Sequence, residues 1–191
     1  MKTCVIMGNG ESLNEMPRDL LSSIPSFGVN YCPHRCTYYV CVDHEILTKH
    51  HAQIYPIARQ AKTAYLAQKE LGTSNLYELP NVKLIAGDRD AFFTEHYFSG
   101  LTVVYVALKC AYYLGFEEVH LFGVDHSPDW KHYRDDYPPG DKDRRAWRMT
   151  EMEYHYALAQ RVYNKVGRVI FNHSRPSKLD AIFRRVGKES K

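Results

Sequence analysis

Near its N-terminus the chain reads Thr3-Cys4-Val5-Ile6-Met7-Gly8-Asn9-Gly10-Glu11-Ser12. The first five residues are a short apolar run that stops at a glycine, which is typical of a buried strand in a parallel sheet. The two glycines of the turn tolerate positive φ and let the backbone approach a bound group closely. Backbone N–H groups of such a turn, and of a helix after it, can bind an anion. The segment therefore favours an α/β fold with a phosphate-type turn behind its first strand.

The spacing of this turn differs from the known phosphate-binding motifs. Gly8, Asn9 and Gly10 do not form the dinucleotide-binding G-x-G-x-x-G pattern, and no Lys-Ser/Thr pair follows them. The missing pair argues against a P-loop kinase. A tight turn without a ligand explains these three residues equally well when they are considered alone.

Strand and helix patterns alternate along the rest of the chain. Apolar runs of strand length occur at residues 26–30, 38–42, 82–85, 118–124 and 168–171. Helical periodicity occurs at residues 99–114 and 150–166, and residues 45–71 are predicted to be partly helical with an interruption at Pro56. The alternation predicts one Rossmann-like α/β domain over residues 1–191, with a mostly parallel sheet and helices on both faces.

Composition limits the class of protein. The chain has 191 residues and a formal net charge of +3. This small positive charge suits an anionic small ligand and argues against a dedicated nucleic-acid binder. The sequence has no run of 18 apolar residues and its N-terminal apolar run is too short for a signal peptide, so we expect a cytoplasmic protein without a membrane span. The five irregularly spaced cysteines argue against a disulfide framework.

Polar residues and glycines stand where the predicted strands end. These residues are Gly8, Asn9, Gly10, Asn30, Asp43, His44, Asp125, His126, Asn172 and His173. In open α/β sheets, ligands bind in the crevice beyond the carboxyl ends of the strands. We therefore predict that these side chains line a common crevice.

A second phosphate-binding feature precedes the helix predicted at residues 99–114. Ser99 and Gly100 would place a hydroxyl and free backbone N–H groups at the positive end of the helix dipole. Ordinary N-capping by Ser99 is the alternative interpretation.

The segment at about residues 126–147 is predicted to be an active-site loop, because structureless segments of this length are often lids or binding loops. It contains His126, His132, Tyr133 and Tyr137 among many charged residues. Histidine suits general-base catalysis near neutral pH, and tyrosine hydroxyls can stabilise a departing phosphate. A solvated surface loop is the alternative interpretation.

These motifs resemble those of the small bacterial sialyltransferases. The resemblance covers the first strand and its glycine turn through Ser12, the strand that ends at Asn30, and the Ser99-Gly100 helix with the strand that ends at Asp125. The chain also resembles a related family of archaeal hydroxymethylpterin pyrophosphokinases and glycosyltransferase-like proteins. That second resemblance rests on the segment Gly123-Val124-Asp125-His126-Ser127 and on a tail with Gly167-Arg168, Asn172 and Lys178-Leu179.

The resemblance implies a nucleotide site and a metal-independent, inverting transfer with a histidine base and no cofactor. The implied nucleotide-binding residues are Gly8, Asn9, Gly10, Ser12, Asn30, Ser99 and Gly100. The family's base histidine falls near Thr150, where this chain has no histidine, so His132 is the predicted base. Asp125 or His126 would organise the site, and the family's second nucleotide-contacting asparagine falls at Asp43.

Three functions follow from these patterns. The first is a glycosyltransferase-like enzyme that moves a sugar from a nucleotide-sugar, such as a CMP-linked sugar, to a hydroxyl acceptor, with Tyr133 and Tyr137 at the leaving phosphate. The second is a pyrophosphokinase that uses ATP and a Mg²⁺ ion held by Asp43 and Asp125. The third is a nucleotide-binding module without catalysis. The sequence leaves the acceptor and the oligomeric state open.

Overall fold

The structure is a computed structural model that describes residues 1–67, 75–85, 101–127, 142–175 and 177–184, with the backbone alone for residues 142–147. The described strands form one seven-stranded sheet in the order β5-β4-β3-β2-β1-β6-β7, and all of its neighbouring pairs are parallel. The strands are β1 (Thr3–Met7), β2 (Ser26–Val29), β3 (Tyr38–Cys41), β4 (Thr63–Ala67), β5 (Val82–Ile85), β6 (Glu118–Phe122) and β7 (Val169–Asn172). The predicted parallel α/β fold is confirmed.

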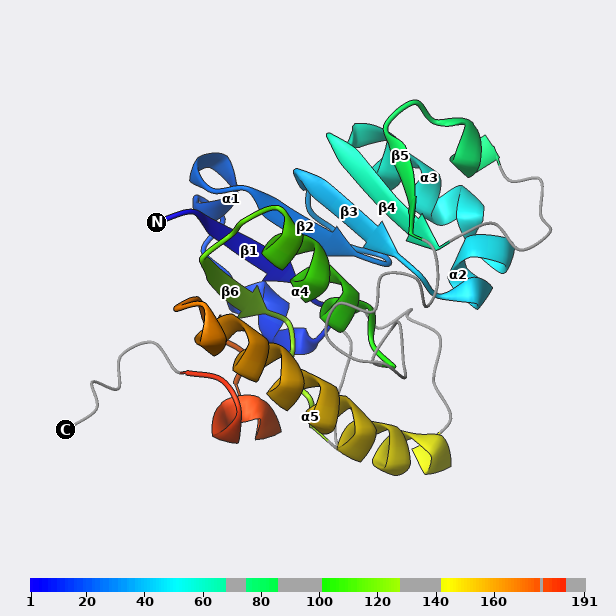
Figure 1. Cartoon of the computed structure of the whole chain (residues 1–191). Coiled ribbons are helices and arrows are strands. Elements are labelled where there is room, and N and C mark those ends of the chain that lie inside the picture. The colour runs from blue at the N-terminus through cyan, green and yellow to red at the C-terminus, as the bar shows by residue number, and fades with distance from the viewer. Residues whose placement is uncertain (68–74, 86–100, 128–141, 176, 185–191) are drawn as a thin grey trace.

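Helices cover both faces of this sheet (Figure 1). The α-helices are α1 (Leu20–Ser23), α2 (His44–Lys49), α3 (His51–Gln60), α4 (Val103–Tyr113) and α5 (Lys142–Lys165). The short 3-10 helices are η1 (Glu11–Glu15), η2 (Asn75–Glu78) and η4 (Lys178–Ala181). In Figure 1, α4 and α5 lie on the face turned toward the viewer, and α3 lies behind the sheet. None of the described helices combines the length and the apolarity that a membrane crossing requires.

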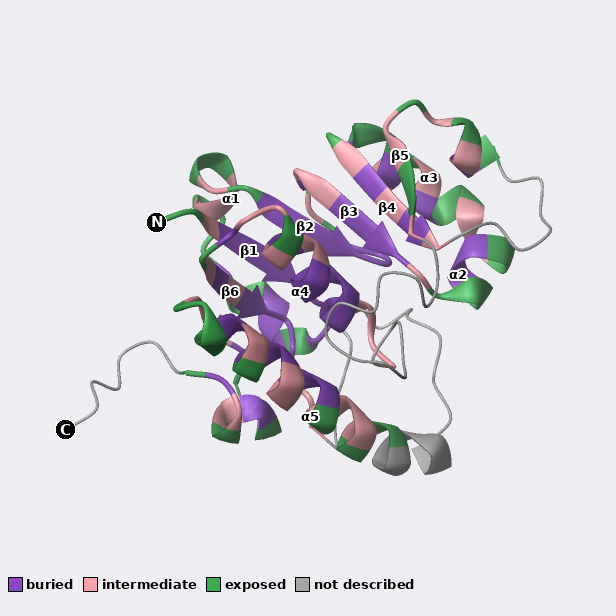
Figure 2. Ribbon diagram, in the orientation of Figure 1, coloured by how far each residue is buried: buried purple, intermediate pink, exposed green. Residues whose placement is uncertain are grey.

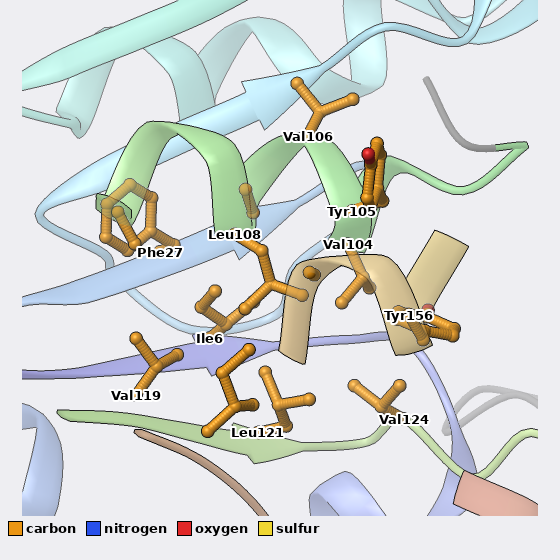
Figure 3. Close-up of a cluster of buried hydrophobic side chains, with 14 of the residues drawn as sticks. Ile6, Phe27, Val104, Tyr105, Val106, Leu108, Val119, Leu121, Val124 and Tyr156 are labelled. Carbon is orange, nitrogen blue, oxygen red and sulfur yellow. The ribbon is translucent and has the colours of Figure 1, made fainter. Parts of the chain in front are cut away.

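The alternation of side chains along β1 explains the two hydrophobic cores. Cys4 and Ile6 point into the core beneath α4 and α5, and Val5 and Met7 point into the core on the opposite face. All four side chains are fully buried, as the central strands are in Figure 2. Figure 3 shows Ile6 in the first core, among apolar side chains of α4 and β6. A strand that is buried on both faces has a continuous apolar sequence, which is why the run Thr3–Met7 predicted the position of β1.

The segment predicted to be helical over residues 45–71 contains a strand as well. β4 occupies its second half, and its side chains alternate between buried and half-buried. Pro56 does not interrupt the helix as predicted but lies inside α3. The proline removes the backbone donor for the carbonyl of Ala52, and both residues are exposed, so water can take the place of that donor.

Two predicted boundaries near the crevice are also wrong. α4 begins at Val103 rather than at Ser99, because the Thr102 hydroxyl caps it by accepting a hydrogen bond from the Val104 amide. α5 begins at Lys142, so the last part of the predicted loop at residues 126–147 is helical.

The strand order reverses beside β1. From β1 to β5 the chain adds strands on one side, and it then returns to place β6 and β7 on the other side. The carboxyl ends of β1 and β6 therefore flank the topological switch point, where ligands bind in open α/β sheets.

Candidate functional site

The glycine turn after β1 packs directly against the end of β6. The amides of Gly8 and Gly10 donate hydrogen bonds to the carbonyls of Phe122 and Gly123, at 2.7 and 2.8 Å. A Cβ atom at Gly8 would lie 2.2 Å from the Gly123 carbonyl oxygen, and one at Gly10 would lie 2.5 Å from an Asp125 carboxylate oxygen. Both positions therefore require glycine, and the turn lies at the switch point of the sheet.

Asp125 holds the far side of this turn. Its Oδ2 accepts a hydrogen bond from the Ser12 amide at 3.1 Å, and its Oδ1 accepts one from the Ser12 hydroxyl. Burial raises the pKa of the Asp125 carboxyl group, and the hydrogen bonds from Ser12 oppose that shift. Both carboxylate oxygens are thus engaged in fixing the turn, which assigns Asp125 and Ser12 an organising role.

Asn30 offers an unused acceptor at the end of β2. Its backbone has a φ of 51°, a left-handed conformation that asparagine adopts more readily than most residues. Its carbonyl accepts a hydrogen bond from the Tyr39 hydroxyl at 2.7 Å, which fixes the backbone. Its amide oxygen Oδ1 is buried and accepts no hydrogen bond from any residue that the structure describes. A buried polar atom of this kind destabilises the fold by about 1–3 kcal/mol unless a ligand or water provides a donor.

Asn9 lies between the glycine turn and β2. Its side-chain amide donates to the Val29 carbonyl at 3.3 Å, one residue before Asn30. This contact links the turn after β1 to the end of β2. The structure therefore brings together four predicted nucleotide-binding residues: Gly8, Asn9, Gly10 and Asn30.

Asp43 has a local structural role. Its Oδ1 accepts hydrogen bonds from the Glu45 and Ile46 amides at 2.9 and 3.3 Å, so it is the N-cap of α2. Asp43 follows β3 and Asp125 follows β6, with β2 and β1 between those strands. Three inter-strand spacings separate the two strand ends by about 14 Å. A single Mg²⁺ ion needs oxygen ligands at about 2.1 Å, so this pair does not fit the ion that the pyrophosphokinase function requires.

His126 is held in place by α5. Its φ is 45°, and its Nε2 lies 3.1 Å from Oε1 of Glu153. The edge of its ring meets the ring of Tyr156, with centroids 5.9 Å apart. Burial lowers the pKa of the His126 imidazole, and the Glu153 carboxylate opposes that shift. The imidazole is therefore fixed in orientation and biased toward its neutral form.

The N-terminus of α4 lies at the same edge of the sheet as the glycine turn. A helix that connects two parallel strands runs antiparallel to them, so its N-terminus lies at the carboxyl edge of the sheet. Thr102, the N-cap, also shares a hydrogen bond with the Tyr156 hydroxyl at 3.3 Å. His155 is buried on α5 and packs against Tyr105 in the first turn of α4, with ring centroids 5.3 Å apart. The helix N-terminus is thus in the predicted place, although its cap is three residues later than predicted.

Five predicted site residues lie outside the described residues: Ser99, Gly100, His132, Tyr133 and Tyr137. Their assigned roles remain predictions. Three residues at the site were not predicted from the sequence: Thr102, Glu153 and Tyr156. Glu153 could have been noticed as an acidic residue beside the apolar helical stripe of Met152, Tyr156, Ala159 and Tyr163.

No protein-family model matches the chain, and no protein of curated function matches it in sequence. Solved structures do match it. The sialyltransferase CstII, in a complex with a trisaccharide acceptor and CMP, has a TM-score of 0.61 at 15% identity, over 96% of this chain and 86% of that chain. A CstII structure from Campylobacter jejuni with the substrate analogue CMP-3FNeuAc has a TM-score of 0.56 at 15% identity, over 97% and 86% of the two chains.

Two further solved structures have the same fold. The monofunctional α-2,3-sialyltransferase Cst-I from Campylobacter jejuni has a TM-score of 0.53 at 15% identity, over 100% of this chain and 83% of that chain. The MAf glycosyltransferase from Magnetospirillum magneticum AMB-1 has a TM-score of 0.61 at 14% identity, but the match covers only 33% of its length and 96% of this chain. The chain therefore has a sialyltransferase-like fold.

Proposed function

We propose that this chain is a glycosyltransferase-like enzyme that moves a sugar from a CMP-linked donor to a hydroxyl acceptor. The observation that carries the proposal is the buried, unused amide oxygen of Asn30 beside the glycine turn, at the switch point of the sheet. The unused acceptor can accept a hydrogen bond from a ligand, and it lies at the edge of the sheet where ligands bind in open α/β folds. The shared fold supports a nucleotide-sugar, because CstII with this fold was crystallised with CMP and with CMP-3FNeuAc.

In this proposal the residues around the glycine turn bind the nucleotide. The turn and the N-terminus of α4 lie beside the phosphate, together with Ser99 and Gly100, while the amides of Gly8 and Gly10 keep their hydrogen bonds to Phe122 and Gly123. Asn30 accepts a hydrogen bond from the nucleoside, whose hydroxyl and amino groups are suitable donors. Ser12 and Asp125 act indirectly, because the hydrogen bonds between them hold the turn in place.

The proposed transfer inverts the anomeric centre. His132 takes the proton of the acceptor hydroxyl, whose oxygen attacks the anomeric carbon of the donor sugar. The bond from that carbon to the phosphate oxygen breaks, and CMP leaves with the electron pair. Tyr133 and Tyr137 donate hydrogen bonds to the departing phosphate, while Asp125 and His126 organise the site.

The pyrophosphokinase alternative is less well supported. The carboxylates of Asp43 and Asp125 lie too far apart to share Mg²⁺, and both accept hydrogen bonds from backbone amides. Among the residues that the structure describes, no group of three His, Cys, Asp or Glu side chains could hold a metal ion.

Release of CMP from a panel of CMP-linked sugars tests the proposal. We expect the wild-type chain to release CMP without Mg²⁺, and we expect release to increase when a hydroxyl acceptor is present. The variant His132→Ala should lose turnover and keep CMP binding, because the proposed base does not hold the nucleotide. CMP binding without turnover of any donor would support a non-catalytic module, and turnover of ATP with Mg²⁺ alone would support the pyrophosphokinase.

A further inference from the structure

One face of α5 reaches two separate parts of the crevice. Glu153 and Tyr156 are three residues apart on this helix, so their side chains share a face. Glu153 contacts His126 at the end of β6, and Tyr156 contacts Thr102 at the N-terminus of α4. Figure 3 shows Tyr156 on α5 between Val104 of α4 and Val124 at the end of β6. The helix therefore joins the end of β6 to the N-cap of α4.

The Glu153 contact orients the His126 ring. A carboxylate only accepts hydrogen bonds, so Nε2 of His126 carries a hydrogen that points toward Glu153. The side chain of His126 is 6% exposed, while that of Glu153 is 37% exposed. Glu153 thus links a buried imidazole to the solvent-facing side of α5.

Several other charged and polar groups act on His126. The Glu153 carboxylate and the Met149 backbone of α5 favour its charged form. Lys178 of η4 and burial itself favour its neutral form, and Asp125 precedes it in the chain. The positive φ of His126 is an uncommon conformation for a residue with a side chain, and it persists only where the surroundings hold it.

The Tyr156 contact acts on the phosphate side of the crevice. Its ring is buried and packs against His126 and Phe183, so the hydroxyl has little freedom to move. That hydroxyl meets Thr102 Oγ1, the atom that also accepts from the Val104 amide. Tyr156 therefore fixes the cap that orients the first turn of α4.

We propose that Glu153 and Tyr156 are positioning residues for the transfer reaction. Glu153 sets the orientation of His126, and Tyr156 sets the N-cap of α4. Together they hold the imidazole and the phosphate-binding helix N-terminus at a fixed separation. This inference rests on the proposed function and assigns part of its machinery to two residues of α5 that follow the predicted active-site loop in the chain.

Two conservative substitutions test the inference, and each has a matched control on the same helix. Glu153→Gln removes the charge and keeps the shape, and Glu151→Gln makes the same change at a residue that does not contact His126. Tyr156→Phe removes only the hydroxyl, and Tyr154→Phe does so at a side chain that is 56% exposed. Steady-state turnover of a CMP-linked sugar and calorimetric binding of CMP are measured for all four variants.

We expect Glu153→Gln to lower kcat about tenfold and to change KM less, which corresponds to one charge-assisted hydrogen bond. Because the lost carboxylate favours the charged imidazole, the His126 titration midpoint, followed by NMR of the ring protons, should move to lower pH. Tyr156→Phe should weaken CMP binding several-fold. The control variants should match the wild-type chain in all three measurements.

The outcomes separate this inference from the proposed function. If the wild-type chain turns over a donor and Glu153→Gln matches Glu151→Gln in kcat and in the His126 midpoint, the positioning role of Glu153 is wrong. If Tyr156→Phe binds CMP as tightly as Tyr154→Phe does, the role of Tyr156 is wrong. If the wild-type chain turns over no nucleotide-sugar, the proposed function itself fails, even where the His126 midpoint still moves.

Discussion

At the residue scale, Asp125 determines whether the glycine turn is ordered. Its carboxylate accepts both the amide and the hydroxyl hydrogen bonds of Ser12, from the far side of the turn. This use of Asp125 could not be read from the sequence, which showed only an acidic residue at a strand end. Ser12 and Asp125 are 113 positions apart in the chain, and the parallel pairing of β1 with β6 brings them together.

We predict that Asp125→Asn lowers the free energy of unfolding by about 1–3 kcal/mol, because an amide has one acceptor oxygen and no charge where the carboxylate accepts at both of its oxygens. Urea denaturation at neutral pH measures this loss. Asp43→Asn is a useful control, since an asparagine caps α2 as well as an aspartate does. Equal stabilities for Asp125→Asn and the wild-type chain would show that the carboxylate does not hold the turn.

A chain of titratable side chains runs along β6 to the end of β7. His120 Nδ1 lies 2.8 Å from His173 Nε2, and His120 Nε2 lies 2.7 Å from Glu118 Oε1. The His173 ring stacks on Phe122, with centroids 4.3 Å apart. Burial, His120 and Arg175 lower the pKa of His173 to about 4, from an ordinary value of 6.5.

This shift predicts that stability falls in mild acid. Between pH 6.5 and about 4 the unfolded chain binds a proton at His173, whereas the folded chain does not. The contribution is therefore fully present above pH 6.5 and is lost as the pH falls toward 4. Urea midpoints measured across this range should fall less steeply for His173→Gln than for the wild-type chain, and parallel curves would contradict the assignment.

At the element scale, α4 shows both the success and the limit of the sequence pattern. Its apolar periodicity predicted the helix, because that stripe faces the sheet. Ser99 and Thr102 are both suitable caps, and the pattern could not distinguish them. The Tyr156 hydroxyl, 54 residues later in the chain, favours Thr102 as the N-cap because it shares a hydrogen bond with the Thr102 hydroxyl.

We predict that Thr102→Ala lowers the free energy of unfolding by about 1 kcal/mol, the usual value of a lost N-cap. Thr102→Ser keeps the hydroxyl and should be close to the wild-type chain. Thermal denaturation followed by circular dichroism measures both variants. If Thr102→Ala and Thr102→Ser unfold at the same temperature, the hydroxyl does not cap α4.

The missed strand β4 has a different cause. Its sequence Thr63-Ala64-Tyr65-Leu66-Ala67 contains three good helix formers, so local propensity favoured a helix. In the fold this segment pairs with β3 on one side and with β5 on the other. Backbone pairing on both sides outweighs a propensity difference of a few tenths of a kcal/mol per residue.

At the scale of the whole molecule, the alternation of strands and helices was sufficient to predict the parallel sheet. The rule that ligands bind at carboxyl strand ends also located the glycine turn, Asn30 and Asp125 at one edge of the sheet. The strand-end rule does not distinguish polar residues that face a ligand from polar residues that stabilise the fold. Asp43 caps a helix and Asp125 holds a turn, whereas Asn30 keeps an unused acceptor.

The central claim is that this crevice binds CMP without a metal ion, and isothermal titration calorimetry with CMP tests it most directly. We predict binding to the wild-type chain in the presence of EDTA. We also predict at least a roughly tenfold loss of affinity in Asn30→Gly, which keeps the positive φ and removes the amide acceptor. An absence of CMP binding, or equal affinities for the two proteins, would contradict the account.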